Sequence, residues 1–548
     1  MSSTALTMVN GRLLTESAST LEVSDFTIYW HGFVYIEGHP GQHESMERLA
    51  QRLTTHPVED AVSVLKGCFF CLIHYTDDSY HAFVDNSGMF AAYESDDGVS
   101  CSFLKLVHEL NLGIEDIDWT NVAEFLQTSN LYFKRTLFAS IKKIGFDQIL
   151  QFSPIDHRCV RLKKNVPDIS DVPAHSSLQH SFEGLATALK GTRVSVDVTG
   201  GLDTRMLIAA LHAADIEFDT AVSGDDDHAD VKIAGDVAES IERPLFVSAH
   251  DISSLAEDLN DTIESLDGLK AHLLTQHRIV QLQESRIQQG VQLCLRGVGG
   301  EQFRDFKWAQ DFPFYRSKKT RLERFDRLRV EVIRVPAALF TDGFKARLND
   351  ARIRRLENYE IYKRVLNTQS YDQIDCKETL QSSHSRSMSV SAKAPMAVYC
   401  PLSEIFRLQH AYHCPRSTRF GAIFQKHFIT TSSRALAKVM TTYGATASTE
   451  PFYLITGSMK LFWTNTKRLI RKLSQTYIGK SPFILVTATK SGSMAALRQS
   501  PVCKESLLAL KRHDILPDTL KEEEISDRFI ERFICLGWLL VKLERKHQ

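Results

Sequence analysis

Apolar and polar residues alternate along the first part of the chain, between about residues 20 and 155. Short runs such as FTIYWHGFVYIEG and VLKGCFFCLIHY are separated by Asp, Gly and Asn residues typical of turns. A period of two places successive side chains on opposite faces of a strand, so this pattern predicts an antiparallel sheet domain. The polar stretch KKNVPDISDVPAHSS follows, and its composition predicts a linker.

The pattern changes after about residue 178. Apolar runs now alternate with amphipathic helical segments: RVSVDV precedes TRMLIAALHAA, and EFDTAVSG precedes DVKIAGDVAESI. A third apolar run, VQLCLRGVGG, leads into polar sequence. Strands that alternate with helices predict βαβ units and therefore a parallel sheet. From about residue 310 onward, the pattern is mostly helical.

Length and charge narrow the class of protein. A chain of 548 residues is too long for one core and predicts about two to four domains. The net charge of -2 argues against binding to nucleic acid or a membrane surface through bulk charge. The start lacks a secretion signal, and the apolar run FICLGWLLV is too short to span a membrane. We therefore expect a soluble, cytoplasmic protein.

The ten cysteines are scattered along the chain. Only Cys68 and Cys71 form a C-x-x-C pair, and a zinc ribbon needs a second such pair. We therefore expect these two residues to be buried strand cysteines in a reducing compartment.

A glycine turn joins the apolar run at 193–198 to the helical segment that follows it. The turn reads Thr-Gly-Gly-Leu-Asp-Thr at 199–204. Such a turn predicts an anion site, because backbone N–H groups and the positive end of the helix dipole face the ligand. It is neither a Walker A loop nor a G-x-G-x-x-G fingerprint. The hydroxyls of Thr199 and Thr204 can donate to phosphate.

Asp203 is out of place beside an anion unless it holds a cation. A magnesium ion that bridges the carboxylate and the phosphates of a ligand resolves this conflict. The alternative is an ordinary strand-to-helix turn, with Asp203 as an N-terminal helix residue.

A second glycine turn follows the apolar run at 291–296. It contains Gly297, Gly299 and Gly300, and the acid Glu301 comes directly after them. Two glycine turns that end strands, each with an acid, suit one ligand at the carboxyl edge of a parallel sheet. Asp203 and Glu301 can then share a magnesium ion. The alternative is tight packing of glycines at the end of a sheet.

Taken in order, these motifs resemble the asparagine synthetase class B superfamily. The turn at 199–204 is similar to the S-G-G-L-D-S loop of its ATP-pyrophosphatase site, and 297–302 is similar to its G-[acid]-G-G/S-D-E signature. The segments 230–241 and 399–415 are similar to further parts of its synthetase domain. A pattern like that of the family's glutaminase domain is formed by Gly67, Asp85, Gly88 and Tyr93.

The resemblance implies a two-domain fold. Residues 1–160 would form an α+β glutaminase-like domain of the N-terminal-nucleophile type, and 161–178 would be the linker. Residues 179–548 would form an α/β synthetase domain of the adenine nucleotide α-hydrolase type, with a parallel sheet and a mainly helical tail. The implied reaction is ATP-dependent activation of a carboxylate as an acyl-adenylate, followed by capture with an amine.

The same resemblance assigns the cofactors, ATP and Mg²⁺, to particular residues. Asp203 and Glu301 would ligate magnesium, and the backbone amides of the first turn would bind pyrophosphate. The strand that ends at Ser223 would lie beside the adenine base. The implied nucleotide-binding set is Thr199, Gly200, Gly201, Asp203, Thr204, Ser223, Gly297, Gly299 and Gly300.

The chain departs from the family in its glutaminase features. The family's nucleophilic cysteine at position two is Ser2 here, and the glutamine-holding loop reads His-Gly-Phe-Val-Tyr-Ile at 31–36. We therefore expect a degenerate glutaminase-like domain and an amine that does not come from glutamine. Val298 stands where asparagine synthetases have an acid and β-lactam synthetases a tyrosine, so any base must come from elsewhere.

The family's late catalytic lysine is also missing from its expected place. The corresponding segment is 424–448, and no lysine stands near Thr446. Lys426 and Lys438 are the candidate replacements, and for each the alternative is a solvated helix lysine. If neither reaches the site, the protein binds nucleotide without turnover.

These observations predict an ATP-dependent amide-forming ligase in peptide, natural-product or glycan biosynthesis, of which lasso-type macrocyclisation is one form. The alternative is a decayed nucleotide-binding scaffold. The expected partners are a small molecule or peptide with a carboxylate and an amine, and biosynthetic partner proteins, with no nucleic acid and no membrane. Basic segments at 315–334 and 460–473 are either solvated helix faces or a groove for an acidic substrate.

Overall fold

The computed structural model describes most of the chain. The described residues are 5–15, 18–154, 158–224, 229–249, 251–304, 326, 335–360, 396–453 and 491–546, with single positions at 455, 459, 463, 466 and 470. Ser2 and nearly all of the two basic segments lie outside them.

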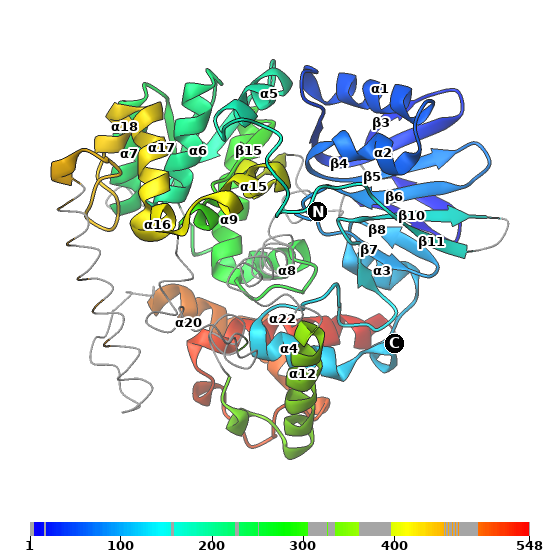
Figure 1. Cartoon of the computed structure of the whole chain (residues 1–548). Helices are drawn as coiled ribbons and strands as arrows, with labels where there is room; N and C mark the ends of the chain where they lie inside the picture. The colour runs from blue at the N-terminus through cyan, green and yellow to red at the C-terminus, as the bar shows by residue number, and fades with distance from the viewer. Residues whose placement is uncertain are drawn as a thin grey trace.

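Two antiparallel sheets form the N-terminal part of the molecule (Figure 1). The first has the order β11-β10-β6-β5-β4-β3. Its strands are β3 (Ser19–Glu22), β4 (Phe26–Tyr35), β5 (Lys66–Tyr75), β6 (Tyr80–Val84), β10 (Gln148–Ser153) and β11 (Arg158–Lys163). The second has the order β2-β1-β8-β7-β9. Its strands are β1 (Leu6–Val9), β2 (Arg12–Thr15), β7 (Tyr93–Ser95), β8 (Gly98–Ser100) and β9 (Lys142–Lys143). β11 thus enters the stretch 161–178 that the sequence predicts as a linker.

Successive side chains of β5 point in turn into the two hydrophobic cores of this region. Cys68 and Phe70 face the core between the two sheets, whereas Phe69 and Cys71 face the core beneath helix α1 (Gly41–Leu53). The two cysteines are buried as predicted, and residues three apart on a strand point to opposite faces, so they cannot chelate one metal. Helices α3 (Phe103–Glu109) and α4 (Trp119–Thr128) cover the outer face of the second sheet.

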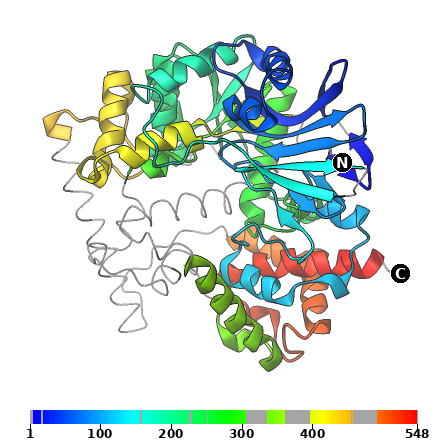
Figure 2. The ribbon, with the colours of Figure 1, turned by 45° about the vertical axis from the view of Figure 1, so that its right-hand side comes forward.

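A parallel five-stranded sheet with the order β14-β13-β12-β15-β16 forms the second region, as the sequence predicts (Figure 2). Its strands are β12 (Val194–Asp197), β13 (Asp219–Ser223), β14 (Leu245–Ser248), β15 (Leu293–Leu295) and β16 (Ala397–Tyr399). The connecting helices are α6 (Leu202–Ala213), α7 (Ala229–Ser240), α8 (Leu255–Ser265) and α9 (Leu273–Gln288). The strand order reverses between β12 and β15, and ligands of open α/β sheets bind at the carboxyl ends of the strands at such a point.

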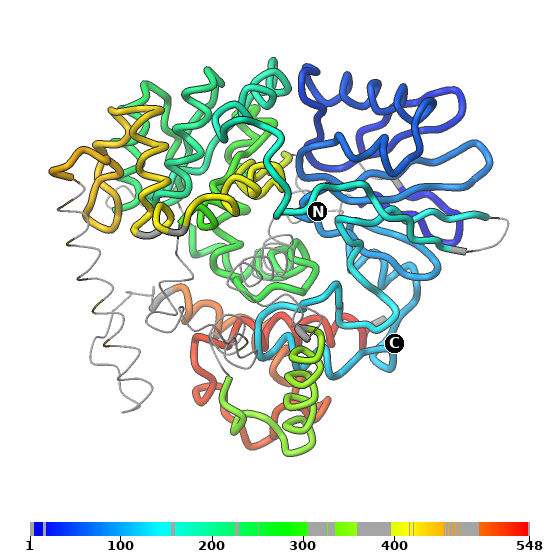
Figure 3. Tube along the Cα trace, viewed as in Figure 1, coloured from blue at the N-terminus to red at the C-terminus, as the bar shows by residue number. Residues whose placement is uncertain are grey.

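Helices from the later part of the chain return to the N-terminal region. They are α12 (Asp342–Glu360), α20 (Ser491–Gln499), α21 (Pro501–Arg512) and α22 (Asp527–Lys546). Arg532 of α22 donates to the backbone carbonyls of Leu126 and Gln127, each at 2.8 Å, and Arg354 of α12 pairs with Asp118 at 2.8 Å. The tube in Figure 3 shows α22 beside α4. Within the described part of the chain, no helix has the length and apolar character needed to cross a membrane.

Candidate functional site

The two glycine turns meet at the point where the strand order reverses. The first follows β12 and the second follows β15. A Cβ atom on Gly297 would lie 2.6 Å from the backbone N and Cα of Thr204, and one on Gly300 would lie 2.7 Å from Cβ of Asp203. Real Cβ atoms do not approach other atoms so closely, so only glycine allows this contact. The structure therefore brings the two predicted turns together as one site.

The first turn leads into helix α6 without a side-chain cap. Gly201 is the N-cap residue, and its N–H lies 3.5 Å from Oγ1 of Thr199, a long contact. The hydroxyls of Thr199 and Thr204 are 3.3 Å apart. The N–H of Gly200 donates to Oδ1 of Asp230 on α7 at 3.3 Å. The carboxylate of Asp230 thus accepts a hydrogen bond from one of the backbone amides that the sequence assigns to pyrophosphate binding.

Asp203 is held by side chains from two other segments. Arg304 donates from Nε to Oδ1 at 2.9 Å and from Nη2 to Oδ2 at 2.6 Å. Gln425 donates from Nε2 both to Oδ1 and to the carbonyl oxygen of Gly300, each at 2.8 Å. Burial alone would lower the pKa of Arg304, but the Asp203 carboxylate raises it above its ordinary value, so the guanidinium stays charged.

The predicted magnesium bridge does not fit this arrangement. Both carboxylate oxygens of Asp203 accept hydrogen bonds from Arg304, and Oε2 of Glu301 accepts one from the N–H of Gly299 at 2.9 Å. The two acids therefore lie at the same site, but protein donors already engage them.

A hairpin at 439–447 lies against the first turn. The N–H of Thr442 donates to the carbonyl oxygen of Gly200 at 3.1 Å, and buried Arg205 of α6 donates to the carbonyl oxygens of Val439 and Met440. Thr446, at the place predicted for the family's lysine, is 7% exposed. This hairpin therefore holds the first turn through Gly200 and Arg205.

The two candidate lysines have different environments. Lys426 lies in α17 (Ile423–Ser432), directly after Gln425; it is 3% exposed, and burial lowers its pKa. The side chain of Lys438, at the end of α18 (Arg434–Lys438), is 54% exposed, and its Nζ lies 4.0 Å from Glu450. Lys438 is thus a solvated helix lysine, the alternative given above. Lys426, in contrast, belongs to the helix that contacts the site.

The sheet edge beside the turns carries excess positive charge. Asp197 ends β12, and its two oxygens pair with Arg286 at 2.6 Å and Arg296 at 2.9 Å. Burial would raise the pKa of Asp197, but the two guanidinium groups hold it below its usual value. This buried cluster carries one net positive charge beside the acids of the two turns. Ser223, which the sequence predicts to lie beside adenine, is the last residue of β13, the neighbour of β12 on the side away from β15.

Sequence reasoning missed Arg304 and Gln425 as partners of Asp203. The signal for Arg304 was present, because it lies three residues after Glu301 in the second turn, and an acid at an anion site needs a nearby cation. Gln425 had no such signal, since only the packing of α17 against α6 brings it to the site.

The N-terminal region holds its motif residues differently. Asp85 is fully buried and accepts hydrogen bonds from the N–H groups of Ser87, Met89 and Phe90 at 2.8–3.1 Å. Its carboxylate closes its own turn and is not presented to a ligand.

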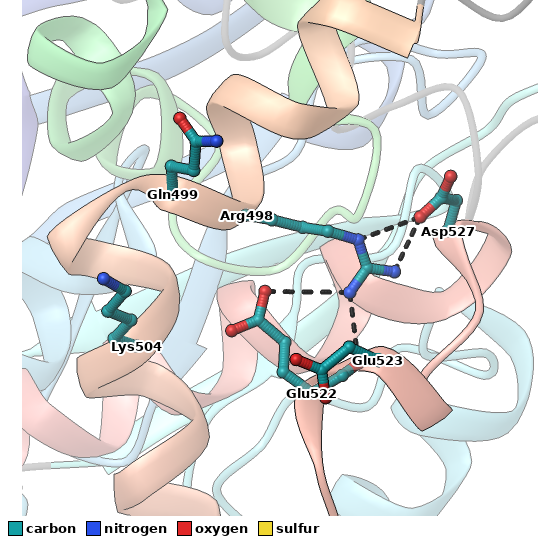
Figure 4. Close-up of a pocket in the computed structure, with 6 residues that line it drawn as sticks. All are labelled: Arg498, Gln499, Lys504, Glu522, Glu523 and Asp527. Atoms are coloured by element: carbon teal, nitrogen blue, oxygen red, sulfur yellow. Dashed lines mark hydrogen bonds and ion pairs between the residues drawn. The ribbon is translucent and has the colours of Figure 1, made fainter.

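A pocket of about 460 Å³ lies among the C-terminal helices (Figure 4). It is lined by Arg498, Gln499, Lys504, Glu522, Glu523 and Asp527. Arg498 already pairs with Asp527 at 2.6 Å and lies 3.7 Å from Glu522. The pocket contains no residue that the sequence predicts to bind a ligand.

Comparison with known proteins adds little to this geometry. No protein-family model matches the sequence, and no curated protein matches it. Among solved structures, the glutamine-dependent NAD+ synthetase from Acinetobacter baumannii, solved in complex with ADP, is 14% identical, with a TM-score of 0.17. The match covers 35% of this chain and 45% of that protein, less than half of its length.

Proposed function

We propose that the chain is an ATP-dependent ligase that forms an amide bond. A substrate carboxylate attacks the α-phosphorus of ATP, and pyrophosphate leaves. An amine then attacks the acyl carbon of the acyl-adenylate, loses a proton and releases AMP. The observation that carries the proposal is the direct contact between two glycine turns at the carboxyl ends of β12 and β15, with the uncapped start of α6 between them.

The electrostatics of the site support this reaction. Negative charge develops on the departing pyrophosphate, and preorganised donors lower the barrier when they face that charge. The amides at the start of α6, Arg304 and the Arg286–Asp197–Arg296 cluster supply positive potential there. Lys426 on α17 is our candidate for a further cation. We propose that the amine comes from a small molecule or peptide rather than from glutamine, since Ser2 and the loop at 31–36 lack the family's glutaminase residues.

ATP binding and pyrophosphate release test this proposal. We expect ATP to raise the melting temperature of the wild-type protein by a few degrees, as saturating ligands do. In EDTA, Arg304→Gln should reduce this shift, because it leaves the negative charge of Asp203 unopposed. Arg193→Gln is the matched control, because Arg193 also pairs with an aspartate, Asp219 at 3.4 Å, but lies at the opposite edge of the same sheet. Formation of AMP and pyrophosphate with a candidate acid would establish the ligase; no shift with ATP would refute nucleotide binding.

A nucleotide-binding protein without turnover is the second candidate. The observation that favours it is that the chain's own groups already satisfy the loop: Asp230 holds the N–H of Gly200, and Arg304 holds Asp203. This candidate predicts an ATP-induced shift that Arg304→Gln reduces in EDTA, but no exchange of labelled pyrophosphate into ATP with any carboxylate tested.

A further inference from the structure

An acid at the start of a helix that binds anions creates an electrostatic conflict. Asp203 lies in the first turn of α6, where the helix dipole and free N–H groups attract negative charge. Its side chain is 25% exposed, so it faces the same space as an incoming phosphate. A carboxylate in that position repels the ligand unless a cation neutralises it.

The chain supplies that cation itself. Arg304 forms two hydrogen bonds to Asp203, one to each oxygen, at 2.9 and 2.6 Å. This paired geometry is the strongest that an arginine and a carboxylate form. Gln425 adds a third hydrogen bond to Oδ1 and ties Asp203 to Gly300 of the second turn. The arrangement thus links three segments around one neutralised carboxylate.

We propose that Arg304 occupies the cation position of this loop and excludes divalent metal from Asp203, so that a guanidinium rather than a metal ion neutralises the loop. Magnesium binds carboxylate oxygens at about 2.0–2.1 Å, and on Asp203 the guanidinium bonds to both oxygens and Gln425 bonds again to Oδ1. Arg304 and a metal ion therefore compete for the same carboxylate. The assignment deepens the proposed function and depends on it only for the identity of the phosphate-bearing ligand.

The chemistry of arginine suits this position. The guanidinium carries five N–H donors in a planar fork, of which the pair with Asp203 uses two, and the fork geometry matches phosphate as well as carboxylate. The side chain of Arg304 is 17% exposed, so it reaches the surface of the site. Glu301, the second acid of the predicted metal site, turns back to the N–H of Gly299 instead of towards a shared metal.

Manganese binding tests the assignment without any nucleotide. Mn²⁺ is titrated into the wild-type protein, Arg304→Gln, Arg304→Lys and the double variant Arg304→Gln/Asp203→Asn, and bound metal is read by electron paramagnetic resonance. We expect no Asp203-dependent site in the wild type, a new site in Arg304→Gln, and its loss in the double variant. Arg304→Lys keeps the charge and should keep the metal out. Arg193→Gln, at the opposite edge of the sheet, is the matched control. Circular dichroism verifies that each variant is folded.

The ligand is tested separately with inorganic pyrophosphate and ATP. We expect the affinity of the wild type to differ less than twofold between EDTA and excess Mg²⁺, whereas Arg304→Gln should lose at least tenfold in EDTA and recover with Mg²⁺. Wild-type Mn²⁺ binding that Asp203→Asn removes would overturn the assignment, as would an Arg304→Gln variant that gains no site. If the Mn²⁺ results are as expected but neither pyrophosphate nor ATP binds, the proposed function fails and the assignment of Arg304 stands.

Discussion

Two aspartates follow strands in this molecule, and their partners differ in kind. Asp85, after β6, is 0% exposed and is held by three backbone N–H groups of its own turn. Asp203, after β12, is 25% exposed and is held by side chains of two distant segments. Sequence reasoning singled out both from motifs and could not separate their roles.

The difference in partners explains the difference in role. Backbone donors within five residues of Asp85 cannot leave it without unfolding the turn, so its carboxylate is part of the fold. Arg304 and Gln425 come from distant segments, so substitution of either side chain changes the charge at Asp203 while the backbone of the turn stays in place. A carboxylate neutralised by a side chain at a glycine turn can tune a ligand site, whereas one closed by its own turn is structural.

The largest expected effect is the loss of stability in Asp85→Ala. This change leaves three buried N–H groups without an acceptor, so we expect the free energy of unfolding to fall by about 3 kcal/mol or more. Asp203→Ala should cost less, because Arg304 reaches solvent. Urea denaturation followed by circular dichroism measures both. Equal losses for the two variants would contradict the comparison.

Gly297→Ala should have the next largest effect. Its new methyl group would meet the backbone of Thr204 at 2.6 Å, and a backbone cannot move aside as a side chain can. We expect a loss of about 2–3 kcal/mol, the upper range for overpacking. The midpoint of thermal unfolding measures this loss. Gly235→Ala, which has open space around its Cβ, is the matched control.

Gly200→Ala should cost less, about 1–2 kcal/mol, because its methyl group meets a side chain. The closest atom is Cγ2 of Thr442 at 2.2 Å. Thr442→Ser removes that methyl group and keeps the hydroxyl, so the double variant should recover most of the lost stability. A double-mutant cycle of unfolding free energies measures the coupling. Additive losses of unfolding free energy would show that the methyl group of Thr442 does not limit the space at Gly200.

An effect of a different kind, a change in pH dependence, is expected from His81, on the strand that leads to Asp85. Burial lowers the pKa of His81 to about 4, from about 6.5 in an unfolded chain. Between these values the unfolded chain binds a proton that the folded protein does not, so stability rises with pH. His81→Gln should reduce this slope by at most about 1.4 kcal/mol per pH unit. Unfolding free energies at pH 4.5, 5.5 and 6.5 test it, with His43→Gln as the exposed counterpart. Equal slopes in wild type and His81→Gln would contradict this prediction.

The sequence predicted local elements better than contacts between distant ones. The strand and helix on either side of 199–204 are β12 and α6, because a change of period from two to 3.6 marks both elements and the turn between them. The sequence also placed both glycine turns at the carboxyl edge of one parallel sheet, whereas the adjacency of β12 and β15 came from the structure. The partners of Asp203 did not follow, because they depend on where α17 packs and on side-chain rotation. Two-residue strands such as β9 carry too few positions for any period to show.

The position of α22 bears on the order in which the protein can fold during synthesis. Helix α4 belongs to the N-terminal region, yet α22, about 400 residues later, contributes Arg532 and apolar residues such as Phe533 and Leu536 to the same core. A ribosome therefore releases the N-terminal sheets and α4 long before the helix that packs on α4 exists. During that interval the apolar face of α4 is exposed and prone to aggregation. Expression of residues 1–178 alone should consequently yield a protein that depends on chaperones, even though its two sheets are complete.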